Sequence, residues 1–445
     1  MAATNQLTFS INIPVSKINT VLKWVVIASI FFLIGTWVHH EQHLFVHRQT
    51  TQFLLMELNL ALENVVAAWY SSMLLFLVAI MAVICYWADR QHISNSKSLI
   101  LNYGWLMIAG AFFMLSFDEM GSFHETIGAL AIFKKRGTDN QAGWYLFYTL
   151  GGLVVVFMIM FFQLEFRKHK KALILTIIGI LLYLSNPFQE RYEHYTWDLA
   201  GHHTDWHRPA YLLLIEEGSE LLAAFCFLYA FTIYAISKTT INNTGTSEKS
   251  LQLDFSIPKK NFFISSFLLL ISLGLLMFII YANAWHNKAD DIGKPQNWFP
   301  SIAAFFTFLI CSYQAFNPGS ENKKDTGIYL MTAAVSLFTS AYFGADIYNY
   351  LNGIFTWGPY LLLAFIIIAA TVLLIKSGTI LARIASLAWI VFIILSIFNK
   401  GYFDRPLFGF IASSCLVIAL FQNIRIGAKQ HLTISSGRSL FSGIK

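Results

Sequence analysis

Acidic residues within long apolar stretches are the feature of this sequence with the clearest chemical meaning. Glu216, Glu217 and Glu220 lie among apolar residues in the stretch 209–237. On a helix these three residues occupy an arc of about 100°. An acid at the centre of a membrane-spanning helix costs about 2.5–3.5 kcal/mol on insertion scales. Three together therefore need a cation, bound protons or basic partners, and the alternative interpretation is a structural ion-pair network.

A second group of polar residues ends the apolar stretch 99–120. Asp118 and Glu119 are followed by His124 and Glu125. On a continuous helix, Asp118 and Glu125 would lie within about 20° of each other, with His124 about 100° to one side. One helix face would then offer two carboxylates bordered by an imidazole. The alternative interpretation is a helix cap with interfacial hydrogen bonds.

Other residues on the same side of the predicted helices could complete a metal site. Glu190 and His194 are spaced i, i+4, as are His203 and His207, so that each pair could bind one ion from a single helix face. The alternative for the histidine pair is a solvated loop. Carboxylate and imidazole ligands suit Zn, Mn or Fe. The predicted metal ligands are Asp118, Glu119, His124, Glu125, Glu190, His194, Glu216, Glu217, Glu220 and Glu63.

The composition indicates which elements hold these residues. Of 445 residues, 56% are hydrophobic and 12% are charged, and the charged share is about half that of a soluble domain. We predict an all-α, multi-pass integral membrane protein, since helices satisfy their own backbone groups in lipid. Twelve apolar runs are long enough to span a bilayer. They are 21–40, 65–87, 99–120, 143–165, 172–189, 209–237, 262–284, 298–317, 328–350, 357–375, 379–398 and 406–424.

The basic residues predict the orientation. With the N-terminus in the cytoplasm, the inner segments hold 20 of the 30 Lys and Arg residues. Both termini are therefore predicted to lie inside. Ten of the 13 histidines and the acidic groups above then face the outer side. The basic inner loops follow from topology, so no nucleic-acid partner is predicted.

The Ser/Thr/Asn-rich stretch 238–260 divides the chain into two predicted six-span halves, 1–237 and 261–445. Trp69 and Trp298 open spans 229 residues apart, and Asp118 and Asp346 end spans 228 residues apart. These offsets predict a parallel 6+6 repeat. The alternative is chance similarity between apolar helices. Most of the polar residues lie in the first half, so the second half is predicted to be a scaffold or to shape the substrate site.

Three segments of the first half carry a resemblance to a family. They are Glu63-Asn64 with Trp69-Tyr70-Ser71-Ser72, Ser116-Phe117-Asp118-Glu119 with His124-Glu125, and Glu216-Glu217 with Glu220-Leu221. Taken together, the first 240 or so residues resemble an uncharacterised group of bacterial six-span membrane proteins. The resemblance implies a bacterial inner-membrane protein and brings no known activity. The second half falls outside it.

Three functions fit this pattern. The preferred one is a membrane-embedded, metal-dependent enzyme that acts on a lipid or lipid-linked substrate near the outer leaflet, by hydrolysis or by di-metal oxidation. Glu217, Glu125 and His124 are its predicted catalytic residues, and a carboxylate would be the general base. The second is a proton-coupled secondary transporter, in which the same acids carry protons. The third is a structural membrane subunit of a complex.

Overall fold

The chain forms two compact units, Met1–Pro295 and Gln296–Lys445, and each is described by itself. The structure is a computed structural model that describes residues 6–41, 49–62, 65–90, 99–121, 141–199, 209–239 and 250–258 of the first unit. In the second unit it describes 297–316, 323–345, 380–398, 411, 412 and 415.

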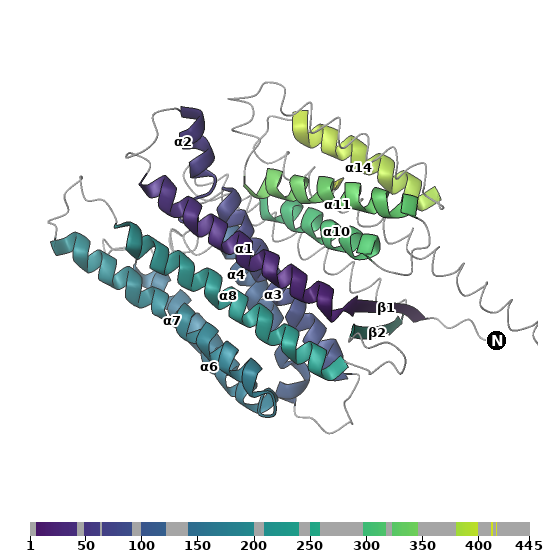
Figure 1. Cartoon of the computed structure of the whole chain (residues 1–445). Helices are drawn as coiled ribbons and strands as arrows, with labels where there is room; N and C mark the ends of the chain where they lie inside the picture. Colours follow the sequence, from purple (N-terminus) through teal and green to yellow (C-terminus); the bar gives the residue numbers. More distant parts are fainter. Residues whose placement is uncertain are drawn as a thin grey trace, which may run out of the picture. The chain divides into compact units, whose positions relative to one another are not determined.

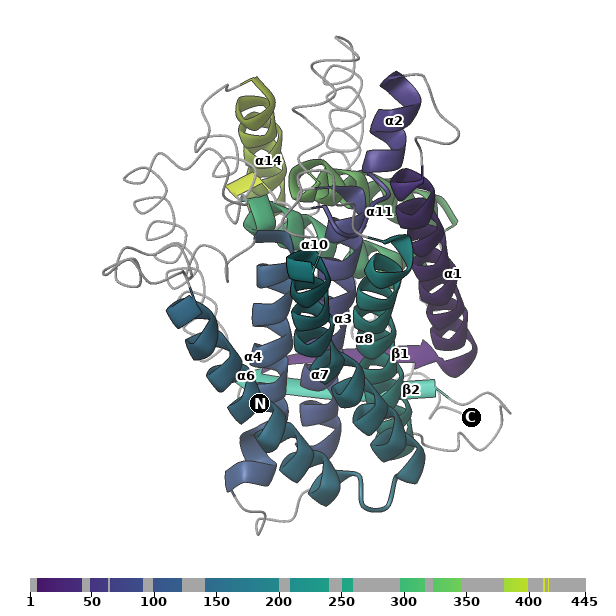
Figure 2. The same cartoon turned by 90° about the vertical axis from the view of Figure 1, so that its left-hand side faces the viewer.

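The first unit is a bundle of long helices (Figures 1 and 2). Its helices are α1 (Val15–His40), α2 (Gln49–Met56), α3 (Val66–Arg90), α4 (Leu99–Gly121), α6 (Gln141–Glu165), α7 (Lys170–Leu199) and α8 (Ala210–Thr239). The predicted helical character is confirmed, and the apolar runs of this half coincide with α1, α3, α4, α6, α7 and α8. Leu22, Val65 and Leu74 are among the buried apolar residues that hold the bundle together.

Five of the described helical segments are long and apolar enough to cross a membrane. They are Val15–His40, Val66–Arg90, Lys170–Gln189, Ala210–Thr239 and Trp298–Ala315. Many of their large apolar side chains are exposed, for example Trp24 on α1 and Leu181 on α7. Exposed apolar helix surface of this extent is typical of a protein surrounded by lipid. The chain is therefore a multi-pass membrane protein, and the total of twelve spans stays a prediction.

A small antiparallel sheet pairs the segment before α1 with a segment after α8, and it was not predicted from the sequence. Strand β1 (Gln6–Pro14) precedes α1, and strand β2 (Ser250–Pro258) follows α8, within the stretch interpreted as a linker. Apolar residues occupy every second position of both strands, which is the period of a half-buried strand. The register aligns these positions, pairing Phe9 with Phe255. The alternation is visible in the sequence, but the Ser/Thr/Asn-rich composition of 238–260 favoured its interpretation as a linker.

Aromatic side chains fill the interior of the bundle between α4, α6 and α8. The Trp105 ring lies 5.2 Å from the Phe161 ring and 5.2 Å from the Phe231 ring, measured between centroids, with edge-to-face geometry in both pairs. A Cβ at Gly104 would overlap the Phe161 ring, so glycine is what lets α6 approach α4 here. The aromatic layer separates the two ends of the bundle by about 20 Å, the length of 14 helical residues between Glu220 and Tyr234.

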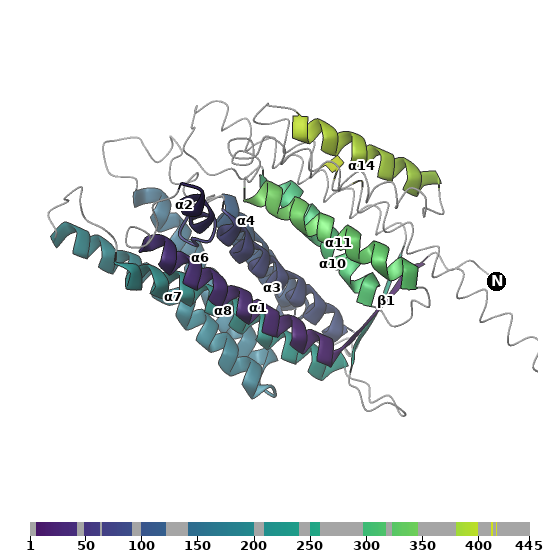
Figure 3. The ribbon, with the colours of Figure 1, turned by 45° about the horizontal axis from the view of Figure 1, so that its top comes forward.

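The second unit contains a helical hairpin and a third helix that packs on it (Figure 3). Helices α10 (Trp298–Phe316) and α11 (Lys323–Gly344) lie side by side, and α14 (Ile380–Phe398) contributes Trp389 and Ile393 to a core with Tyr342 and Phe343. These four side chains are almost completely buried.

A serine pair joins one hairpin in each unit in the same way. The hydroxyl of Ser72 on α3 donates to the carbonyl of Ser116 on α4 at 2.6 Å, and the two hydroxyl oxygens are 3.1 Å apart. On α10 and α11, Ser301 and Ser340 repeat this arrangement at 2.8 and 3.1 Å. Small residues of this kind let membrane helices approach closely. The shared arrangement agrees with the predicted repeat, which over six spans each stays a prediction.

Candidate functional site

The predicted acidic residues that the structure describes lie at one end of the first bundle. Helices α3 and α4 are antiparallel, and so are α7 and α8, as the order of the contacts along each pair shows. Helix α8 runs parallel to α3, because Phe231 and Tyr234 contact Cys85 and Asp89 in the same order along the two helices. The end of α4, the middle of α7 and the first turns of α8 are thus brought together. We call this end, which holds Glu119, Tyr183 and Glu220, the carboxylate end.

Glu220 is held by a hydrogen-bond chain between α7 and α8. The amide nitrogen of Asn186 on α7 donates to Glu220 Oε1 at 2.5 Å. The hydroxyl of Ser219 lies 2.8 Å from Asn186 Oδ1, which orients the amide so that its NH₂ group faces Glu220. Asn186 and Ser219 are both 8% exposed. A hydrogen bond to an ionised carboxylate is stronger than a neutral one, so Asn186 stabilises and positions a charge on Glu220.

Glu119 from α4 comes close to the same place. The carboxylates of Glu119 and Glu220 both interact electrostatically with the hydroxyl of Tyr183 on α7. All three side chains are half-buried. The polar surroundings continue along α7, where Gln189 donates to the Ser185 hydroxyl at 2.9 Å. Half-buried carboxylates from α4 and α8 thus belong to the same end of the bundle.

Pro187 contributes to this region through the backbone of α7. It lies within the helix and has no N–H group. The Tyr183 carbonyl, four residues earlier, therefore lacks its usual intrahelical donor. This carbonyl can therefore accept a hydrogen bond from outside the helix backbone.

The other predicted ligands fall into three sets. Asp118, Glu216 and Glu217 are half-buried on α4 and α8, whereas Glu190 and His194 belong to the continuous helix α7, which gives them the i, i+4 spacing that the prediction requires. Three predicted ligands lie outside the described residues: Glu63, His124 and Glu125. Among the residues that the structure describes, no three His, Cys, Asp or Glu side chains form a metal-binding group.

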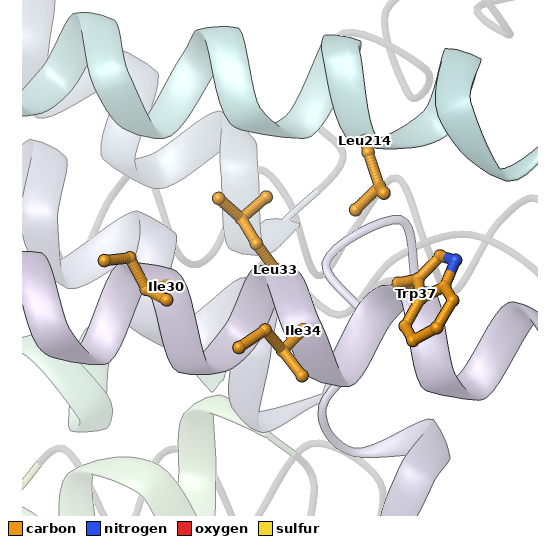
Figure 4. Close-up of a pocket in the computed structure, with 5 residues that line it drawn as sticks. All are labelled: Ile30, Leu33, Ile34, Trp37 and Leu214. Atoms are coloured by element: carbon orange, nitrogen blue, oxygen red, sulfur yellow. The ribbon is translucent and has the colours of Figure 1, made fainter.

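An apolar groove lies beside the carboxylate end, between α1 and α8 (Figure 4). Its volume is about 350 Å³, and it is lined by Ile30, Leu33, Ile34, Trp37 and Leu214. Ile34 is 56% exposed and Trp37 46% exposed, so the groove opens to the outside of the bundle. A Cβ at Gly218 on α8 would stand 3.7 Å from the Leu33 side chain, which is an ordinary packing distance between α8 and α1.

Asn186, Tyr183 and Ser219 were not singled out from the sequence. They are uncharged, whereas the sequence prediction of the site rested on Asp, Glu and His residues. The signal that could have found Asn186 is an amide in an apolar span directly before a proline, because a polar side chain in such a span usually bonds to another helix.

One comparison with known proteins bears on this segment. Residues 21–235 match a family model. The family is described as a domain of unknown function, DUF8692. The DUF8692 segment begins in α1 and ends in α8, so it includes Glu119, Tyr183 and Glu220. The predicted resemblance to an uncharacterised family over the first half is thereby confirmed. No curated protein and no solved structure matches the chain.

Proposed function

We propose that the chain is a membrane-embedded, metal-dependent enzyme that acts on a lipid or lipid-linked substrate. The observation that carries this proposal is a pair of half-buried acids from two helices, Glu119 and Glu220, at one end of an apolar bundle, where Asn186 donates a hydrogen bond to Glu220. Two carboxylates in an apolar bundle repel each other and lose hydration, and a divalent cation between them offsets both effects.

The ligand set would combine described and predicted residues. Glu119 and Glu220 would bind the ion, together with the predicted ligands Asp118, His124 and Glu125, which lie within six residues of Glu119 in the sequence. Asn186 would hold Glu220 in place, because a hydrogen bond from a neighbouring side chain orients a metal ligand. Zn, Mn or Fe suits such oxygen and nitrogen donors. Such a metal would activate water or polarise an ester or phosphoryl oxygen, with Glu217 as general base.

The apolar groove supports a lipid substrate. Leu214 lines the groove, and Glu217 lies three residues further along α8, on the same side of the helix. An acyl chain in the groove would therefore place its headgroup near the carboxylates. The groove opens outward through Ile34 and Trp37, as entry from the bilayer requires.

The small sheet supports the proposed topology. Because β1 and β2 pair, the segment before α1 and the segment after α8 are on the same side of the membrane, and the chain between them crosses an even number of times. Six spans satisfy this condition. Lys238 and Arg90 lie at the sheet end, which the basic-residue rule assigns to the cytoplasm. We place the protein in a bacterial inner membrane, with both termini cytoplasmic and the carboxylate end at the outer leaflet.

An activity screen tests the substrate class. The full chain, purified in detergent and loaded in turn with Zn, Mn or Fe, is incubated with total bacterial lipid extract, and products are identified by mass spectrometry. A metal-dependent product that disappears in Glu220→Gln and persists in Glu41→Gln supports the proposal. Unchanged lipids under all three metals contradict it.

Proton-coupled transport is the second candidate, favoured by a separate observation. The opposite end of the bundle buries another charged group, in which Lys238 Nζ lies 3.2 Å from Asp89 Oδ1. Ionisable residues within membrane helices form the proton relays of many pumps and transporters. Substrate uptake into proteoliposomes driven by a pH step, and lost in Glu220→Gln, would favour transport over catalysis.

A further inference from the structure

The connection between α6 and α7 carries a compact group of basic residues. They are Arg167, Lys168, Lys170 and Lys171, and all four side chains are exposed. Helix α6 ends at Glu165 and α7 begins at Lys170, so only residues 166–169 connect the two helices (Figure 1). The four cations therefore form one patch on the surface, which we call the basic turn.

Buried side chains fix the basic turn at the sheet end of the first bundle, where α8 ends. The Phe166 ring is completely buried, and its centroid lies 5.7 Å from that of Trp105 and 4.9 Å from that of Tyr234. His169 contacts the same Tyr234 ring edge-on at 5.1 Å. The His169 N–H donates to the Phe166 carbonyl at 2.8 Å, and the Leu173 N–H donates to the His169 carbonyl at 3.1 Å. The cations thus project from a backbone that is held in place.

No described acid neutralises the basic turn. Glu165, the nearest acid in the sequence, is only 6% exposed, and its Oε1 accepts a hydrogen bond from the Tyr234 hydroxyl. The first turn of α7 contains no acidic residue. Lys238 at the same end has an acidic partner, since its Nζ lies 3.2 Å from Asp89 Oδ1. The four cations of the basic turn, by contrast, form no ion pair within the part of the chain that the structure describes.

Helix stability and topology do not account for this grouping. Lys170 and Lys171 are in the first turn of α7, where the helix dipole makes a cation unfavourable. The basic-residue rule explains on which side of the membrane these residues lie. It does not require cations to be neighbours or to be held by a buried turn. An anion as the partner of the basic turn explains both features.

An apolar stripe on α7 begins beside the basic turn. Ile174, Ile178 and Leu181 follow Lys170 at i+4, i+8 and i+11, which places all four residues on one side of the helix. The three apolar side chains are exposed. From Lys170 to Leu181 the helix rises about 16 Å, which is about half of the hydrocarbon thickness of a bilayer. The stripe is therefore as long as an acyl chain in one leaflet.

Helix α6 has a corresponding stripe that ends at the basic turn. Val156, Met160 and Leu164 are spaced i, i+4 and i+8, and each side chain is more than half exposed. Leu164 lies three residues before Arg167. Each helix thus offers an exposed apolar surface that leads to the same four cations, which is the arrangement of chains and headgroup in a phospholipid.

We propose that the basic turn binds the phosphate headgroup of an anionic phospholipid, whose acyl chains lie on the apolar stripes of α6 and α7. Clusters of four or more Lys and Arg residues beside a membrane helix are typical of sites for anionic lipid headgroups. A zwitterionic headgroup brings no net negative charge, so the site selects an anionic lipid. It is distinct from the carboxylate end and from the groove between α1 and α8, and it does not depend on the function proposed for them.

Native mass spectrometry of the full chain in detergent tests this inference. The chain is titrated with phosphatidylglycerol or with phosphatidylcholine that carries the same acyl chains, and the lipids bound per chain are counted. We expect tighter binding of phosphatidylglycerol. The double variant Lys170→Gln/Lys171→Gln should weaken this binding about fivefold for each cation removed, which is the contribution of one basic residue at an anionic lipid surface.

Two double variants serve as controls. Lys17→Gln/Lys23→Gln removes the same charge from α1 and should bind phosphatidylglycerol like the wild type. Lys170→Arg/Lys171→Arg keeps the charge of the basic turn and should also bind like the wild type. If the double Gln variant fails to fold, Lys168→Gln alone should show the loss expected for one cation.

Three results would overturn the proposal. The first is equal binding of the two lipids by the wild type, and the second is an equal loss in the Gln variants of the basic turn and of α1. The third is displacement of phosphatidylglycerol by inorganic phosphate, because a site that needs no acyl chain is an anion site and not a lipid site.

Discussion

Asn186 on α7 donates a hydrogen bond of 2.5 Å to Glu220 on α8, and Ser219 holds the Asn186 amide in the orientation that makes this donation possible. Asn186 is buried, so few waters can replace it. The bond therefore fixes both the position of the Glu220 carboxylate and the packing of the two helices.

Replacing Asn186 by Ala should lower the free energy of unfolding by about 1.5–3 kcal/mol, the contribution of a hydrogen bond to a charged group. In a Glu220→Gln background the same change should cost about 0.5–1.5 kcal/mol, as for a neutral bond. Thermal unfolding of the four proteins in a double-mutant cycle measures the difference. Leu184→Ala, on the exposed side of α7, is the control. Equal losses in both backgrounds would show that the bond does not involve a charge.

Gly104 and Gly110 on α4 should respond differently to alanine. A Cβ at Gly104 would overlap the Phe161 ring, which Trp105 holds in place, so Gly104→Ala should destabilise the protein by about 1–3 kcal/mol. A Cβ at Gly110 meets no atom of the described residues within 4 Å. Gly110→Ala should therefore be neutral or add up to about 1 kcal/mol. Melting temperatures compare the two variants, and similar values would contradict the packing of α4 against α6.

The sheet register predicts a specific cross-link. Thr8 and Ser256 are Cα partners, so Cys residues at both positions lie at the separation of a disulfide. Cys residues at Thr8 and Gln252 would be out of register by four residues, about 13 Å. Mild oxidation should join the first pair and not the second, as detected by mass spectrometry of peptides. Cross-linking of both pairs, or of neither, would contradict the pairing on which the even number of crossings rests.

His169 predicts a loss of stability in acid. Its pKa in the folded protein is lowered from 6.5, first by burial and then by Lys238, so the unfolded chain binds more protons just below pH 6.5. The free energy of unfolding should therefore fall as the pH drops through this value. His169→Gln should be less sensitive to pH between 7 and 5. Unfolding in denaturant at several pH values tests this, and parallel curves for the two proteins would contradict it.

The helices were predictable because an apolar run of about 20 residues in lipid has few structures available to it. Glu119 and Glu220 could also be singled out as candidate ligands from the sequence, since charge in an apolar span is costly wherever it occurs. The spacing of acidic residues within one helix does not indicate which other helix packs beside them. That information came from Asn186 and Tyr183, neutral residues on α7.

The buried charged residues at the sheet end of the first bundle show the same limit. In the sequence, Asp89 and Lys238 each follow an apolar run and Glu165 ends one. Their grouping depends on Tyr234, 145 residues from Asp89 in the chain. Helix pairing of this kind follows from tertiary packing, and no local pattern encodes it.

The central claim is that Glu119 and Glu220 share a divalent cation. Metal content per chain, measured by plasma mass spectrometry on the purified full chain after dialysis against Zn, Mn or Fe, tests it most directly. We predict at least one tightly bound ion per chain in the wild type and in Glu41→Gln, with the bound ion lost in Glu119→Gln and Glu220→Gln. Stoichiometric metal in neither the wild type nor the control, or an unchanged metal content in both Gln variants, would contradict it.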